Sequence, residues 1–159
     1  FLNFARPRKP VLASCKIDDV IEKNISFLEP QLVENKYTIE TNLGDNFPPI
    51  LADSDMLYQA FLNILINAMQ AMPHGGSVII SAKTDDQNIK LSFKDHGKGI
   101  PEEVMEKIWD PFFTTKEKGT GLGLGIVRNI IESHNGEIQI NNLSDGAEVS
   151  IILPVGRRE

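Results

Sequence analysis

Apolar positions recur at helical spacing in three segments of the chain. Residues 17–36 carry an apolar side chain at about every third or fourth position, which predicts a helix that bends near Pro30. Residues 53–72 predict a long, strongly apolar helix that the sequence "PHGG" ends. A third helix is expected at residues 121–135, and a short one at residues 102–108.

Apolar and polar positions alternate elsewhere, as they do in strands that have one buried face. The polar turn "TDDQN" joins two of these strands into a hairpin. Some strands follow one another directly and others are separated by helices, so we expect a mixed sheet that helices cover on one face. The predicted strands are residues 37–42, 77–83, 89–95, 136–142 and 147–154.

Residues 96–120 break both patterns. They contain Gly, Pro and Lys and offer little regular structure beyond the short helix. An irregular connection of this length in a compact domain is usually functional, and often it is a lid over a binding site.

Composition and charge narrow the class of protein. A chain of 159 residues is long enough for one domain with one core, and no apolar run approaches the roughly 18 residues that cross a membrane. The net charge of −6 argues against a broad nucleic-acid surface. Cys15 is the sole cysteine and the three histidines are scattered, so neither an internal disulfide nor a structural zinc site is expected.

The first residues, "FLNFARP", have the apolar content of a helix end that stops at a proline. We interpret residues 1–10 as the end of a helix and a linker from a preceding domain, and residues 11–159 as one folded domain. The alternative is a frayed terminus.

The sequence "KGTGLGLGI" places glycine at every second position from Gly119 to Gly125. It is not a Walker loop, because no Gly-Lys-Ser/Thr occurs, and it is not a dinucleotide fingerprint, because no strand precedes it and the third glycine is missing. What remains is a glycine string at the start of an apolar helix, where free N–H groups attract anions. A flexible hinge before a helix is the alternative.

The helix at 53–72 carries a stripe of four amides. Gln59, Asn63, Asn67 and Gln70 share one side, and the apolar residues that flank them predict a helix buried nearly all round. An unpaired buried amide costs roughly 1 to 3 kcal/mol, so each amide requires a partner. The partner is either a neighbouring loop or a ligand such as a Mg²⁺ ion held by the Asn67 carbonyl oxygen.

Asp95 continues the apolar face of its strand and therefore points inward. An inward carboxylate needs a donor, and the amino group of an adenine is one such donor. Gly97 and Gly99 follow at once and leave room for a flat ring. A simple turn capped by Asp95 is the alternative.

Four segments now resemble, in order, the motifs of one family. They are similar to the N, G1, F and G2 boxes of the ATP-binding catalytic domain of sensor histidine kinases, and the similarity covers about residues 11–155. The resemblance implies a Bergerat fold, an α+β two-layer sandwich whose mainly antiparallel sheet of about five strands is covered on one face by three helices, with a mobile ATP lid at 101–120. The four segments are "NILINAMQA" (63–71), "DHGKGI" (95–100), "DPFFTTK" (110–116) and "GTGLGLGI" (119–126).

The resemblance also assigns roles to residues. It implies that Asn67 binds Mg²⁺, that Asn63 lies close to the phosphates, that Asp95 binds the adenine amino group, and that Asn63, Asn67 and Lys116 act in catalysis. Phe112 and Phe113 are expected to pack the lid. The complete set of nucleotide-binding residues implied is Asn63, Asn67, Gln70, Asp95, Gly97, Gly99, Ile100, Lys116, Lys118, Gly119, Thr120, Gly121, Leu122, Gly123 and Leu124.

The chain departs from the family at three places. Related ATPases carry a water-activating glutamate where this chain has Asn63, and an amide cannot act as a general base at neutral pH, so ATP hydrolysis should be slow. Gln70 and Ala71 replace a Lys-Tyr type pair, and Ala147 replaces a frequent threonine. These replacements put one cationic phosphate contact, one aromatic adenine contact and one hydroxyl in doubt.

None of His74, His96 and His134 stands in the context of a phosphate acceptor, so the acceptor histidine is expected upstream of Phe1. The resemblance thus implies a cytoplasmic kinase domain that passes the γ-phosphoryl group of Mg-ATP to a histidine of a dimerisation domain, and from there to a response regulator. The full-length protein would be a homodimer and this domain alone a monomer. The rivals are a regulatory module that only binds ATP and an anti-sigma-factor-type serine kinase.

Overall fold

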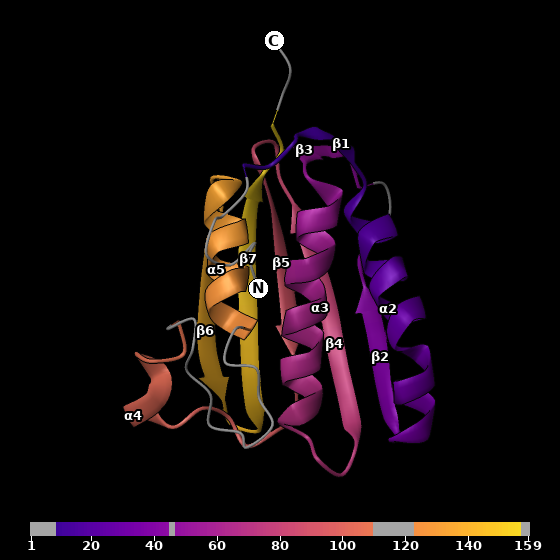
Figure 1. Cartoon of the computed structure of the whole chain (residues 1–159), viewed down its shortest axis with the longest axis vertical. Coiled ribbons are helices and arrows are strands. Elements are labelled where there is room, and N and C mark those ends of the chain that lie inside the picture. The colour runs from indigo at the N-terminus through magenta and orange to yellow at the C-terminus, as the bar shows by residue number, and fades with distance from the viewer. Residues whose placement is uncertain (1–8, 45–46, 110–122, 157–159) are drawn as a thin grey trace.

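The computed structural model describes residues 9–44, 47–109 and 123–156. Within these ranges, a layer of three helices lies on one face of a five-stranded sheet (Figure 1). The helices are α2 (Ile17–Glu34), α3 (Ser54–Gln70) and α5 (Gly123–Ser133). The strands, in their order across the sheet, are β2 (Tyr37–Asn42), β4 (Gly76–Thr84), β5 (Asn88–Lys94), β7 (Gly146–Pro154) and β6 (Glu137–Leu143).

The predicted fold class is confirmed. β2 pairs with β4 in parallel, and the three other neighbouring pairs in the sheet are antiparallel, so the sheet is mixed and mainly antiparallel. All five predicted strands are present within two residues of their expected ends. Pro30 lies inside α2 without ending it, and α4 (Glu102–Met105) is shorter than the helix predicted at 102–108. No helix in the described ranges is long and apolar enough to span a membrane.

A small second sheet was missed from the sequence. β1 (Ala13–Cys15) pairs antiparallel with β3 (Ile50–Ala52), and the two strands lie beyond the end of the main sheet at the N-terminal ends of α2 and α3 (Figure 1). Strands of three residues are too short to show an alternating pattern, so their pairing partner decides their conformation.

One hydrophobic core fills the space between the two layers. Ile89, Leu91 and Phe93 of β5 are all buried, as their alternation predicts, and the ring of Phe93 lies 5.6 Å from that of Phe61 on α3. Burying one such side chain contributes roughly 1.5 to 3 kcal/mol. The core therefore fixes how α3 sits across the sheet.

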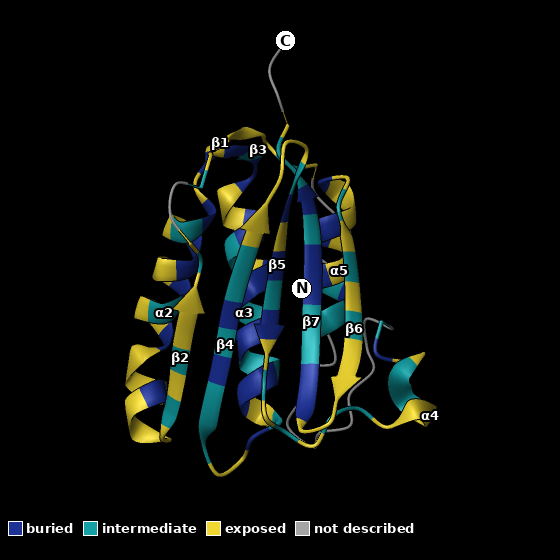
Figure 2. Cartoon of the chain, turned by 180° about the vertical axis from the view of Figure 1, so that it is seen from behind, coloured by how far each residue is buried: buried dark blue, intermediate teal, exposed yellow. Residues whose placement is uncertain are grey.

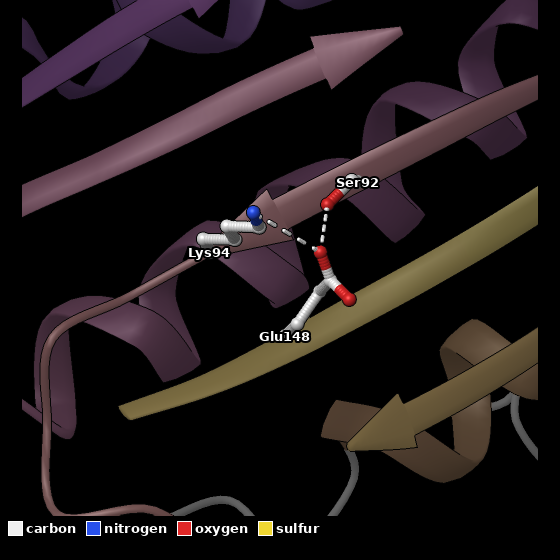
Figure 3. A network of polar contacts seen from close by, with 3 residues as sticks. All are labelled: Ser92, Lys94 and Glu148. Atoms are coloured by element: carbon white, nitrogen blue, oxygen red, sulfur yellow. Dashed lines mark hydrogen bonds and ion pairs between the residues drawn. The ribbon is translucent and has the colours of Figure 1, made fainter. Parts of the chain in front are cut away.

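The other face of the sheet has no helix over it among the described residues (Figure 2). Polar side chains cover its middle. Ser92 donates a hydrogen bond of 2.7 Å to Glu148, whose carboxylate also lies 3.8 Å from the Lys94 ammonium (Figure 3). Partly exposed ion pairs of this kind stabilise by about 1 kcal/mol at most. The polar side chains show that this face of the sheet is exposed to solvent.

The expectation that α3 is buried nearly all round is wrong. Gln59 and Gln70 are exposed, and Asn63 and Asn67 are half-buried. The helix lies on the sheet as an outer layer, so only the side that faces the sheet is removed from water. The amide stripe is on the side that remains accessible.

Candidate functional site

Three segments that are distant in sequence meet at one end of the molecule, the lower end in Figure 1. They are the C-terminal half of α3, the loop that follows β5 and the first turn of α5. A Cβ atom placed on Gly123 would lie 2.8 Å from Asn67 Nδ2, and one placed on Gly97 would lie 2.5 Å from the carbonyl oxygen of Ala71. The tertiary structure thus brings together the amide stripe, the Asp95 loop and Gly123, where the described part of the glycine string begins.

Asn63 and Asn67 leave their amide groups available at this end. Both side chains are half-buried, and in the described part of the chain neither makes a hydrogen bond. The requirement for a protein partner does not hold, because water reaches both amides.

Asp95 forms the capped turn considered for it and keeps one carboxylate oxygen available. Its Oδ1 accepts the N–H groups of Gly97 at 2.9 Å and Ala147 at 3.2 Å, and its own N–H donates to the Ala147 carbonyl at 3.0 Å. The bond from Gly97, two residues on, is the capped turn that was the alternative. Within the described residues, no hydrogen bond reaches Oδ2, so one carboxylate oxygen stays free for a donor outside the protein.

Gly97 and Gly99 lie against other parts of the protein. Packing, rather than the approach of a ligand, therefore explains why these two positions are glycine. Gly97 fits against the end of α3 at Ala71. Gly99 has φ of +77°, and a Cβ there would lie 2.9 Å from Asn142 Oδ1. Both positions therefore require glycine for packing and backbone conformation even without nucleotide.

Ile100, Gly123 and Leu124 are half-buried at the same end of the fold, and Gly125 is buried within α5. The suggestion that Gly125 serves close packing agrees with its burial. The remaining predicted residues lie outside the described ranges. They are Phe112, Phe113, Lys116, Lys118, Gly119, Thr120, Gly121 and Leu122.

The histidines have the structural roles expected from the sequence or lie at the surface. His134 is 6% exposed; its Nε2 accepts the N–H of Asp53 at 3.0 Å, and its Nδ1 lies 2.8 Å from the Ile130 carbonyl oxygen. Because Nε2 accepts, Nδ1 carries the proton and donates to that carbonyl. His74 and His96 are exposed, and His96 Nδ1 lies 3.1 Å from the Ser77 carbonyl oxygen.

Sequence reasoning missed two residues that hold the site. The Tyr37 hydroxyl lies 2.8 Å from the Met69 carbonyl oxygen and 2.7 Å from that of Met72, and so holds the C-terminal end of α3. Asn142 on β6 bonds both backbone groups of Ile100 at 2.7 Å. Neither residue belongs to a motif, and only their position beside the loop and the helix end identifies them.

The residues at this end fit a metal ion that takes only one or two of its ligands from the protein. No group of three or more His, Cys, Asp or Glu side chains in the described ranges could hold a metal ion. Asn67 Oδ1 is a neutral oxygen ligand at a position open to water. Mg²⁺ commonly takes one or two protein oxygens and completes its shell with water and phosphates, so the residues present fit it.

A cleft of about 1240 Å³ lies away from these segments, beside the N-terminal ends of α2 and α3. Four acidic residues and two lysines line it, and this excess of negative charge disfavours a phosphorylated ligand; they are Asp18, Asp19, Glu22, Asp55, Lys16 and Lys23. The size of this cleft therefore does not identify it as the nucleotide site.

A two-layer α+β fold, an accessible amide wall beside the first residue of α5 and a carboxylate with one free oxygen are compatible with a domain that binds a nucleotide. The family described as "Histidine kinase-, DNA gyrase B-, and HSP90-like ATPase" matches residues 52–157, and the chain belongs to this family. It is the ATP-binding catalytic domain of a two-component sensor histidine kinase.

Characterised relatives point the same way. The chain is 36% identical to sporulation kinase E of Bacillus subtilis, over 98% of this chain and 21% of that protein. It is 36% identical to the signal transduction histidine-protein kinase AtoS of Escherichia coli, over 97% of this chain and 26% of that protein. The chain therefore spans about a quarter of the length of these two relatives.

Solved structures agree with the fold. The catalytic domain of histidine kinase ThkA, in a nucleotide-free form, superposes with a TM-score of 0.84 at 30% identity, over 92% of this chain and 97% of that one. Full-length ShkA in complex with AMPPNP superposes with a TM-score of 0.86 at 28% identity, over 99% of this chain and 35% of that one.

Proposed function

We propose that the protein to which this domain belongs uses Mg-ATP to phosphorylate a histidine on a dimerisation domain, from which a response regulator aspartate receives the phosphoryl group. The observation that carries the proposal is the amide wall at the C-terminal half of α3. Asn63 and Asn67 are accessible and unpartnered in the described part of the chain, and Asn67 lies against the first residue of α5.

The residues at this end divide the work of binding. Asp95 Oδ2 accepts the adenine amino group while Oδ1 stays bound to Gly97 and Ala147. The backbone N–H groups at the start of α5, with Gly123 and Leu124, receive the phosphates. Gln70, Lys116, Lys118 and residues 119–122 are proposed to complete the phosphate site when the lid closes.

Asn63 explains why the γ-phosphoryl group is kept for a protein nucleophile. α3 has no acidic residue after Asp55 in its first turn, so no carboxylate on this helix activates water beside the phosphates. Asn63 positions groups but accepts no proton. Mg²⁺ supplies charge neutralisation at the phosphates, and Asn67 is the residue proposed to hold it.

The proposed partners require an acceptor histidine other than His134. His134 is buried and bonded through both ring nitrogens, which leaves it no role as nucleophile. We assign residues 1–10 to the end of a preceding dimerisation domain, and the full-length protein to a homodimer whose kinase domain, a monomer by itself, lies on the cytoplasmic side. A structure of the relative ThkA holds its response regulator TrrA, which supports the same kind of partner here.

A reconstitution tests the proposal. The 159-residue chain is mixed with Mg-ATP labelled in the γ-phosphate and with the dimerisation domain of its parent protein. Acid-labile phosphate on that domain is expected, at least about 100-fold slower with Asn67→Ala, which removes the proposed Mg²⁺ ligand. Gln31→Ala, which removes an exposed amide on α2, is the matched control and should transfer at the wild-type rate.

The same experiment distinguishes the rivals. ATP binding without transfer to any added dimerisation domain would favour a regulatory module. Phosphate that is stable to acid and appears on a serine of an added protein would favour the anti-sigma-factor type. Because Asn67 is half-exposed and asparagine is a poor helix former, Asn67→Ala should leave the free energy of unfolding unchanged or raise it slightly, so lost transfer would not reflect unfolding.

A further inference from the structure

We propose that Asn142 is a positioning residue for the nucleotide: it holds the end of the Asp95–Ile100 loop in its binding shape without touching the ligand. The inference rests on the proposed nucleotide site. It adds to that site a residue of β6 that lies outside every motif of the chain.

The Asn142 side chain forms two hydrogen bonds with the backbone of one residue, Ile100. Asn142 Oδ1 accepts the N–H of Ile100 at 2.7 Å, and Asn142 Nδ2 donates to the carbonyl oxygen of Ile100, also at 2.7 Å. A side-chain amide has the same donor and acceptor as a peptide group. Asn142 therefore pairs with Ile100 as a neighbouring strand would, although Ile100 is in a loop.

The loop is held at both ends by the same hairpin. Asp95 exchanges backbone and side-chain bonds with Ala147 on β7, and Ala147 is the register partner of Asn142 on β6. One pair of facing residues thus holds the first and the last residue of the loop. Between them, the contacts among the described residues are the N–H of His96, 3.4 Å from the Met72 sulfur, His96 Nδ1, 3.1 Å from the Ser77 carbonyl oxygen, and the Asp95 bond to Gly97.

Gly99 supports the same conclusion from sterics. It has φ of +77°, and a Cβ at this position would lie 2.9 Å from Asn142 Oδ1. The close approach of the Asn142 side chain is possible because Gly99 has none. Without Asn142, the loop would gain freedom that nucleotide binding must remove, and affinity would fall.

The experiment measures ATP affinity by calorimetry on the 159-residue chain and its variants. Asn142→Ala should weaken ATP binding about three- to tenfold, since its two bonds are exposed to competing water. Asn142→Asp should weaken it further, because a carboxylate cannot donate to the Ile100 carbonyl and repels it. Asn141→Ala is the control, since Asn141 is the exposed neighbour on the same strand, and its affinity should equal wild type.

Hydrogen exchange supplies a second measurement that does not depend on ATP binding. In the wild-type chain, the Ile100 amide should exchange about tenfold or more slowly than the Gly99 amide, and Asn142→Ala should remove the difference while the melting temperature stays within about 2 °C. Wild-type affinity in both Asn142 variants, or an unprotected Ile100 amide in the wild type, would overturn the inference. If the wild type itself fails to bind ATP, the proposed function fails instead.

Discussion

The polar side chains at the two ends of α3 differ in whether they form hydrogen bonds within the protein. At the N-terminal end, Asp53 caps the helix: its carboxylate accepts the N–H groups of Met56 at 3.1 Å and Val11 at 3.0 Å, and its own N–H donates to His134. At the C-terminal end, Asn63 and Asn67 make no side-chain hydrogen bond in the described part of the chain.

The difference separates polar residues that folding needs from polar residues that are left available for a ligand. Asp53 and His134 are 5% and 6% exposed, and at that burial an unpaired group would cost roughly 1 to 3 kcal/mol, so their bonds are needed for folding. The asparagines are half-exposed and lose little without a protein partner. A polar group that folding does not need is one that a ligand can use.

The largest effect is expected from His134→Ala. The variant leaves the Asp53 N–H and the Ile130 carbonyl without their partner and opens a small cavity, so the free energy of unfolding should fall by about 3 kcal/mol. Urea denaturation measures the loss, and calorimetry on the folded variant should give an ATP affinity within about twofold of wild type. His74→Ala, at an exposed site, is the control and should change stability by less than about 0.5 kcal/mol. Equal stability of both variants would mean that water replaces the His134 bonds.

Cys15 lies at the same end of α3 as Asp53, and its thiol should make the stability of the chain depend on pH. Burial first, then Asp19, Asp53 and Asp18, raise the pKa of the Cys15 thiol from 9.0 to about 11. The unfolded chain loses this proton at lower pH than the folded chain, so stability falls as pH rises from about 9 to about 11. The fall should be of the order of 3 kcal/mol and absent from Cys15→Ala, measured by urea denaturation at each pH. Parallel pH profiles of the two proteins would contradict the prediction.

Asp95→Asn tests the functional end with a nearly isosteric change. The asparagine carbonyl oxygen can still accept the N–H groups of Gly97 and Ala147, so the loop should stay in place. The amide that replaces Oδ2 cannot accept the adenine amino group. ATP binding should weaken at least about tenfold, or about 1.4 kcal/mol, with little change in melting temperature. Unchanged affinity by calorimetry would remove the adenine role of Asp95.

Gly123→Ala should have the smallest effect. The added methyl group would lie 2.8 Å from Asn67 Nδ2, and the amide would turn away from its present position. Transfer in the reconstituted reaction should slow about three- to tenfold, with stability within about 0.5 kcal/mol. Gly136→Ala offers the structural counterpart, because its methyl group would lie 2.5 Å from the Ile152 backbone oxygen and should lower stability with no separate effect on transfer.

Much of the fold follows from local pattern. The alternation of β5 and the spacing along α2 and α3 predict both the elements and their buried faces, because the core demands one apolar side from each. β1 and β3 were not predictable in this way, since each exists only through its pairing with the other. The burial of α3 was overestimated because a sequence does not tell which layer a helix occupies.

The sequence by itself determined the chemistry of the candidate site: Asn63, Asn67, Asp95 and the glycines lie in motifs that are local and ordered. Only the tertiary structure decided how that chemistry is held. Asn142 is 42 residues from Ile100, Ala147 is 52 from Asp95 and His134 is 81 from Asp53. Hydrogen bonds across such separations depend on the packing of the sheet and helices, and no local pattern of residues records them.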